Sequence, residues 1–365
     1  IKGGLFDCCE NLTNVTIPES VVNIGDYAFY RCHSLASIDI PYKVTYIGTR
    51  AFSECSRLTS IIIPNSVTDI GDEVFQFCSN LENVEMSNNL ISIGSRMFSY
   101  CNSLKSVEIP ITVISIGDEA FYNCGSLENI IIPNSVTSIG SGSFHNCRNL
   151  QEVTLPPNIE SINDEVFSYC EKLVNIEIPN KVTAIGEKAF SGCSGLTDIK
   201  LPKSVLSIGN GCFLSCNGLT SMTIPKSVSS IGKGIFAFCN NIEKIEVSSE
   251  NKAYYSVDNC LIEKSTKELI AGCKNSIIPS DESIQRIGAA VFFNCNISAC
   301  LDIPNGVTNI EKYAFYFCYS LTNIKIPNTV INIEELAFAE CSGLTSIEYN
   351  GTMAEWRAIN KGRNW

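Results

Sequence analysis

The sequence predicts a solenoid of about 14 short stacked coils, and three observations support this fold class. A unit such as residues 32–55 returns with a 23-residue period along nearly the whole chain. Each unit carries leucine and isoleucine in the pattern L-x-x-I-x-I, which is typical of leucine-rich repeats. A single unit of this kind cannot bury its own apolar face, so neighbouring units must stack. We therefore expect an α/β-type leucine-rich repeat solenoid that is rich in β-structure.

The L-x-x-I-x-I segment of each unit predicts a short strand. Ile38 and Ile40 illustrate it, because single polar residues separate the apolar ones, as in a half-buried strand. One such strand per coil would build a parallel sheet, which we expect on the concave face. Proline follows, as at Pro41, and should end the strand because it cannot donate to a ladder. A second short extended piece then ends at Ile47, before Gly48, which would suit a tight bend.

The return side of each coil is marked by phenylalanine, followed three residues later by cysteine. Around Phe52 we expect a short turn or one turn of 3-10 helix, with the ring pointing inward. Fourteen of the 19 cysteines share this repeat position and would stack in one internal column, as reduced thiols that act as small apolar residues and weak donors. Among the other cysteines, Cys260 and Cys273 are the best candidates for a disulfide.

We predict one solenoid domain over residues 1–365. It comprises regular coils over 1–247, an irregular repeat with a β-hairpin insert over 248–278, regular coils over 279–348 and a helical cap over 349–365. The apolar runs 260–262 and 269–271 predict a hairpin that projects from the rod. In the cap, Thr352 can begin a short helix with Glu355 three residues on, and Met353, Trp356 and Ile359 would share one face.

The first residue, Ile1, falls at an isoleucine position of the repeat, so the chain begins inside a coil. We therefore expect a piece of a longer protein, whose export signal or anchor would lie outside this sequence.

Composition excludes several classes of function. The chain of 365 residues has 26 basic and 38 acidic residues and a net charge of -12, which argues against nucleic acid or an anionic membrane as the main partner. No run of 18 apolar residues predicts a membrane span. The two histidines, His33 and His145, lack the spacing of a zinc site, and no catalytic motif is found. We expect no enzyme, no metal and no cofactor.

Two sets of residues are candidates for partner binding. Glu82, Glu85, Glu108 and Glu128 lie in or beside predicted strands of the middle coils, where an acidic cluster would receive a basic segment of a partner. The alternative is a solvated face that keeps a long sheet soluble. The second set is the aromatic row within F-x-x-C, including Tyr100 and Tyr169, which would form a binding ridge for protein or glycan or would pack around the turn.

The unit L-x-x-I-x-I-P-x-S-V-x-x-I-G-x-x-A-F-x-x-C, as at residues 58–78, resembles the BspA-like leucine-rich repeat family of bacterial and protist surface proteins. The resemblance covers essentially the whole chain and extends to the interruption at 255–271 and the ending at 349–359. Departures include Glu311 and Glu334 in place of the glycine. The resemblance implies a surface or secreted protein of a host-associated microbe that is involved in adhesion, and the family has no shared active site.

We hypothesise a non-enzymatic, extracellular or cell-surface monomer that mediates protein-protein or cell and matrix adhesion. Two alternatives stay open. One is a structural spacer that displays other domains of a longer protein. The other is an accessory module that binds glycan through the aromatic row.

Overall fold

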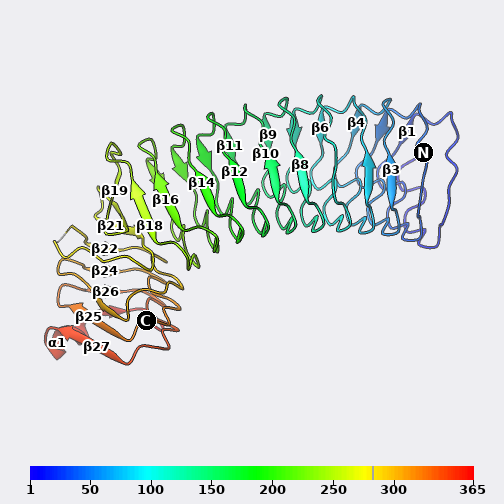
Figure 1. The fold of residues 1–365 in the computed structure, drawn as a ribbon. Helices are drawn as coiled ribbons and strands as arrows, with labels where there is room; N and C mark the ends of the chain where they lie inside the picture. Colours follow the sequence, from blue (N-terminus) through cyan, green and yellow to red (C-terminus); the bar gives the residue numbers. More distant parts are fainter. Residues whose placement is uncertain (282) are drawn as a thin grey trace. The chain divides into compact units, whose positions relative to one another are not determined.

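The structure is a computed structural model that describes residues 1–281 and 283–365. The chain is a solenoid of about 14 turns of about 23 residues with parallel sheets and almost no helix, which confirms the predicted fold class (Figure 1). It contains two compact units, Ile1–Val182 (unit 1) and Thr183–Trp365 (unit 2). Each unit is itself a stack of coils, and the assignment of residues 1–365 to a single domain stays a prediction.

The first strand of a coil lies in the L-x-x-I-x-I segment. Its central apolar residue is buried and the residues on either side are exposed, so that Ile61 lies inward between Ser60 and Ile62. In unit 1 these strands are β3 (Ser60–Ile62), β5 (Asn83–Glu85), β8 (Asn129–Ile131), β10 (Glu152–Thr154) and β12 (Asn175–Glu177). In unit 2 they are β14 (Asp198–Lys200), β16 (Ser221–Ile224), β18 (Lys244–Val247), β23 (Cys300–Asp302), β25 (Asn323–Pro327) and β27 (Ser346–Asn350).

The second strand of a coil is only two residues long and ends on a buried isoleucine in most coils. In unit 1 these strands are β1 (Asn23–Ile24), β2 (Tyr46–Ile47), β4 (Asp69–Ile70), β6 (Ser92–Ile93), β7 (Ser115–Ile116), β9 (Ser138–Ile139) and β11 (Ser161–Ile162). In unit 2 they are β13 (Ala184–Ile185), β15 (Ser207–Ile208), β17 (Ser230–Ile231), β22 (Arg286–Ile287), β24 (Asn309–Ile310), β26 (Asn332–Ile333) and β28 (Asn360–Lys361). They pair in parallel in several short sheets, such as β1-β2-β4 and β6-β7-β9, and isoleucines of neighbouring coils lie opposite one another, as Ile24 lies opposite Ile47.

The glycine after the second strand has a different role from the tight bend predicted for it. At Gly117 the neighbouring coil comes so close that an added Cβ would lie 2.6 Å from the backbone nitrogen of Ser95. Real Cβ atoms essentially never approach another atom so closely. The glycine therefore serves the close stacking of one coil on the next.

The return side of each coil consists of consecutive turns, which include left-handed residues. Arg50 and Glu54 have φ values of 55° and 63°. Alternate N–H groups donate to the neighbouring coil, as Phe52 N–H donates to the carbonyl of Val74 at 3.0 Å. The N–H groups between them close turns within the coil, as Ala51 donates to Gly48. Few backbone groups are thus left without partners, although no helix forms here.

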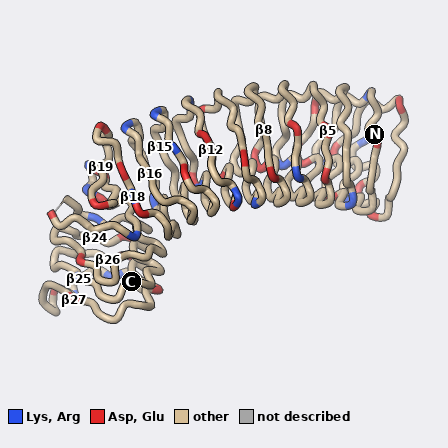
Figure 2. The backbone as a smooth tube through the Cα atoms, viewed as in Figure 1, with Lys and Arg blue, Asp and Glu red and all other residues tan. Residues whose placement is uncertain are grey.

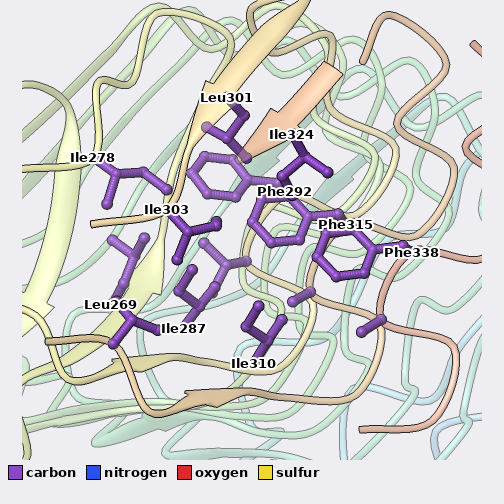
Figure 3. Packing of buried hydrophobic residues seen from close by; sticks show 14 of the residues in the cluster. Leu269, Ile278, Ile287, Phe292, Leu301, Ile303, Ile310, Phe315, Ile324 and Phe338 are labelled. Carbon is purple, nitrogen blue, oxygen red and sulfur yellow. The ribbon is translucent and has the colours of Figure 1, made fainter. Parts of the chain in front are cut away.

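The phenylalanine of each coil is buried and stacks on its equivalents. In unit 1 the rings of Phe52 and Phe75 have centroids 5.7 Å apart and planes 5° apart. Figure 3 shows the same column in unit 2, where Phe292, Phe315 and Phe338 follow one another among buried isoleucine and leucine side chains. The column forms the centre of each core.

The cysteine column runs beside the phenylalanine column, and its thiols donate hydrogen bonds to the backbone carbonyls of the phenylalanines. The carbonyl of Phe98 accepts the N–H of Cys101 at 3.0 Å and the thiol of Cys124, in the next coil, at 3.1 Å. Burial raises the pKa of several thiols in this column, to about 12 for Cys78 and Cys147. The cysteines are free thiols, and most are buried. They act as small apolar residues with a weak donor, as predicted.

The irregular repeat in unit 2 is an antiparallel meander of β19 (Tyr254–Val257), β20 (Cys260–Glu263) and β21 (Glu268–Ala271). Sequence analysis predicted the β20–β21 hairpin but missed β19. It also expected the hairpin to project, whereas β20 and β21 are largely buried, because β21 pairs in parallel with β22 and so joins the sheet of the following coils. Cys260 and Cys273 lie here as free thiols, so the predicted bridge is not formed.

The chain ends in the predicted short helix, α1 (Met353–Ala358), with Thr352 as N-cap and a reciprocal capping box with Glu355. Trp356 packs against the core of unit 2, and Ile359, just after the helix, is buried. Met353 was expected on the same face but is 66% exposed, because the helix is too short to bury more than its C-terminal end.

A cluster of charged side chains lies beside the meander in unit 2. Glu311, which replaces the repeat glycine, is almost fully buried, binds Lys233 Nζ at 2.8 Å and forms a short ion pair with Arg286. Burial opposes its ionisation, but the hydrogen bonds from Lys233 and Arg286 outweigh burial and hold the pKa of Glu311 below its ordinary value. Burial and the charge of Glu311 raise the pKa of neighbouring Glu268.

We predict that most thiols are unreactive in the folded protein. At pH 8 and without denaturant, a thiol reagent such as DTNB should modify only exposed Cys8 and Cys300 and half-exposed Cys9 rapidly, because the other thiols are buried. In guanidinium chloride without reductant all 19 should react. A smaller number in denaturant would reveal disulfides and contradict the thiol column.

We predict that Glu311→Gln lowers the free energy of unfolding by about 2 kcal/mol at pH 7, because it breaks an ion pair whose carboxylate is buried. Because the folded pKa of Glu311 is lowered, its contribution is present above its ordinary pKa and is lost as the pH falls through the folded value. Urea unfolding followed by circular dichroism from pH 7 to pH 3 measures both effects. Glu334→Gln is the matched control, since Glu334 also replaces a repeat glycine but, within the described residues, its carboxylate accepts a hydrogen bond from the backbone N–H of Lys312 and forms no salt bridge. Equal losses in the two variants would contradict the prediction.

Candidate functional site

The predicted binding residues lie on two different surfaces of unit 1. We call the exposed side of the first strands, with Glu82, Glu85, Glu108 and Glu128, the strand surface. The outer side of the turns, with Tyr100 and Tyr169, is the turn surface. Repeat register assigns each set to its surface, because equivalent residues of successive coils stack on one another, as Ile62 lies opposite Glu85.

The acidic residues of the strand surface are exposed and lack ion-pair partners. Glu85 ends β5, and Glu108 occupies the same repeat position one coil later. Within the described residues, no salt bridge is formed by Glu82, Glu85, Glu108 or Glu128. Lys105 is the basic residue between Glu82 and Glu128 in the repeat register. Figure 2 shows acidic positions (red) recurring along the strands around β5, β8 and β12.

An apolar groove lies on the strand surface beside Glu108, and sequence analysis missed it. Its volume is about 670 Å³, and it is lined by residues 106–109, Ile111, residues 129–135 and Thr154. Val107, Ile109, Ile130 and Ile132 form a buried floor. Above this floor, Ile111 is 85% exposed and Ile131 is 75% exposed.

The sequence does contain a signal for this groove. Ile111 and Ile131 occupy repeat positions that neighbouring coils fill with polar residues, namely Asn134 for Ile111 and Thr154 for Ile131. Isoleucine side chains at these exposed positions do not contribute to the packing of the core. Covering one isoleucine side chain with a partner is worth about 1.5–3 kcal/mol.

The turn surface is electrostatically different, because its charges are paired from coil to coil. Arg50 binds Glu73 at 2.6 Å, and Arg96 binds Glu119 through two hydrogen bonds of 2.8 and 3.0 Å. The bond from Arg96 lowers the pKa of Glu119 despite its partial burial. The acidic residues of this surface therefore have neighbours in the chain that neutralise them.

Aromatic rings on the turn surface stack on one another. Phe77 and Tyr100 have centroids 4.5 Å apart and planes 17° apart, Tyr122 and His145 are stacked at 4.8 Å, and Tyr169 is tilted against His145. A sugar ring binds to an aromatic residue by lying on its face, and in the stacked pairs Phe77–Tyr100 and Tyr122–His145 a neighbouring ring already covers one of these faces. This packing favours the interpretation of the row as support for the turns over that of a glycan ridge.

Within residues 1–281 and 283–365, no group of three or more His, Cys, Asp or Glu side chains is placed to hold a metal ion. No helix in the described part of the chain has the length and apolar character needed to cross a bilayer.

Comparisons with known proteins agree with this architecture. The family model described as "BspA type Leucine rich repeat region (6 copies)" matches residues 1–125, 82–174, 114–243, 160–270 and 266–358. A search of curated proteins found no match.

Two solved structures resemble the chain over most of its length. A leucine rich cell surface protein from Faecalibacterium prausnitzii A2-165 is 30% identical, with 99% of this chain and 85% of that chain covered and a TM-score of 0.57. A leucine-rich repeat protein from Bacteroides ovatus ATCC 8483 is 29% identical, with 89% of this chain and 82% of that chain covered and a TM-score of 0.64.

The family match spans nearly the whole sequence, and repeats of this kind are typically non-enzymatic scaffolds that bind proteins. From the repeat, its core columns and these matches, the chain belongs to the BspA type leucine rich repeat family.

Proposed function

We propose that the chain is an extracellular or cell-surface adhesin-like protein that binds a protein of a host matrix or of another cell through the strand surface of unit 1. One observation carries this proposal: three isoleucines stand exposed along the strand surface of unit 1, whereas most isoleucines of the repeat are buried. Ile62, Ile111 and Ile131 are 61%, 85% and 75% exposed. Exposed apolar patches of this kind mark interaction sites in soluble proteins.

Two further observations support the cellular setting and the oligomeric state. The Faecalibacterium relative, 30% identical to this chain, is described as a cell surface protein. The net charge of -12 favours a soluble monomer, because like-charged copies repel one another.

The proposal predicts that charge reversal on the strand surface weakens binding to a matrix protein. Wild-type protein should bind at least one of a panel of immobilised matrix proteins, such as fibronectin, fibrinogen, laminin and collagen, in surface plasmon resonance. The double variant Glu85→Lys with Glu108→Lys should weaken that binding at least about tenfold, because like charges then face a basic partner. Both residues are exposed and lack an ion pair in the described chain, so folding should be unaffected.

The matched control is Glu10→Lys with Asp69→Lys. It produces the same change in net charge at exposed positions outside the first strands. A second control, Tyr100→Ala with Tyr169→Ala, removes rings from the turn surface. If the Glu85→Lys with Glu108→Lys variant and both controls bind a matrix protein with wild-type affinity, the strand surface is not the site of matrix binding. If the panel shows no binding at all, the adhesin proposal fails. Deletion of the meander is unsuitable as a test, because its strands are buried in the core of unit 2.

A further inference from the structure

We propose that the groove between residues 106–111 and 129–135 is a receptor site for a basic-apolar peptide segment, in which a short run of aliphatic residues is flanked on both sides by lysine or arginine. The inference rests on the proposed function in that it names the class of partner for the strand surface. It differs in assigning the contact to one groove and in specifying the chemistry of the ligand.

The apolar half of the recognition comes from the arrangement of isoleucines. Ile130 and Ile132 are 2% and 1% exposed and belong to the floor, whereas Ile131, between them in the chain, points outward from β8. Ile111 belongs to the preceding coil, lines the same groove and is also exposed. An aliphatic side chain laid between Ile111 and Ile131 would be covered from both sides and would rest on the buried floor.

The charged half of the recognition comes from uncompensated carboxylates. Glu108 lines the groove, and Glu85 precedes it by one coil in the same row of repeat positions. On the turn surface the carboxylates of Glu73 and Glu119 have arginine partners in the neighbouring coil. Glu85 and Glu108 form no salt bridge within the described residues. A binding partner with basic side chains could therefore neutralise these two carboxylates. Negative charge at one side of an apolar floor complements a segment that carries basic residues beside aliphatic ones.

The distribution of polar groups in the groove favours a peptide. Asn129, Asn134, Ser135 and Thr154 lie along the lining and supply donors and acceptors that a peptide backbone can use. The groove lining contains no aromatic ring on which a sugar could stack; the exposed aromatic row lies on the turn surface instead. The negative charge of the strand surface opposes nucleic acids and anionic lipids.

The test uses a synthetic peptide of three leucines flanked on each side by two lysines, measured by isothermal titration calorimetry or fluorescence anisotropy. We expect saturable binding to the wild-type chain that weakens as sodium chloride rises from 50 to 300 mM, because salt screens the flanking charges. A peptide with serine in place of the leucines should bind at least about tenfold more weakly, as should one with glutamate in place of the lysines.

The decisive variant is Ile111→Asn with Ile131→Thr. It introduces the residues that the next coil carries at the same repeat positions, Asn134 and Thr154, so the fold should tolerate it. Peptide affinity should fall at least about tenfold. The matched control is Ile62→Thr, which removes an exposed isoleucine from the same repeat position outside the groove and should leave affinity unchanged.

Three results would overturn the inference: no binding of the leucine-lysine peptide, equal binding to the groove variant, or equal binding of the serine-containing peptide, which would mean attraction by charge alone. These results differ from failure of the proposed function. Suppose that a matrix protein binds wild type and the groove variant equally but binds the Glu85 and Glu108 variant more weakly. The strand surface would then remain the adhesive site, and the groove would be rejected as the contact. Peptide binding in the groove without any matrix binding would support the groove as a peptide site and contradict the adhesin proposal.

Discussion

The structure depends on the stacking of each side chain onto its own equivalent in the next coil. A constant 23-residue spacing brings Phe52 over Phe75 at 5.7 Å and lets the Cys124 thiol reach the carbonyl of Phe98. Because the same set of contacts recurs between each pair of neighbouring coils, a residue type that satisfies its neighbours in one coil also satisfies them in the next. The columns of phenylalanine, cysteine and isoleucine thus follow from the repeat itself. They explain why the cores consist of few residue types and why the repeat leaves freedom only on its outer positions.

Much of the fold could be predicted because its determinants are periodic. The buried isoleucines of the strands, the inward phenylalanines and the thiol column all confirm the sequence analysis. The predictions that were wrong concern contacts between coils that periodicity does not describe. The repeat glycine is required by the backbone of the next coil, as at Gly117, and not by a bend. The hairpin strands are buried because β21 finds a parallel partner in β22, which no local pattern of residues 260–271 indicates.

The candidate site was predicted only in part for the same physical reason. Glu85 and Glu108 share one repeat position, so the sequence alone aligns them on one surface. The groove combines two repeat positions from adjacent coils, Ile111 at a corner and Ile131 in a strand, and requires knowledge of which isoleucines face outward. Likewise, the ring-on-ring packing of Phe77 and Tyr100 depends on side-chain direction, so the exposure of the aromatic row could not be judged beforehand.

The equivalence of coils has a consequence for how such a chain evolves. Recombination between repeats that adds or removes one 23-residue unit leaves every internal column continuous, because any coil can stack on any other. What changes is the set of outward residues that become neighbours. Loss of the coil that carries Ile131 would bring Thr154 beside Ile111 and would erase the groove in a single genetic event, with little effect on stability. The outward surface of this chain can therefore diversify by shuffling of whole coils, a route closed to proteins whose exposed surface and core share the same residues.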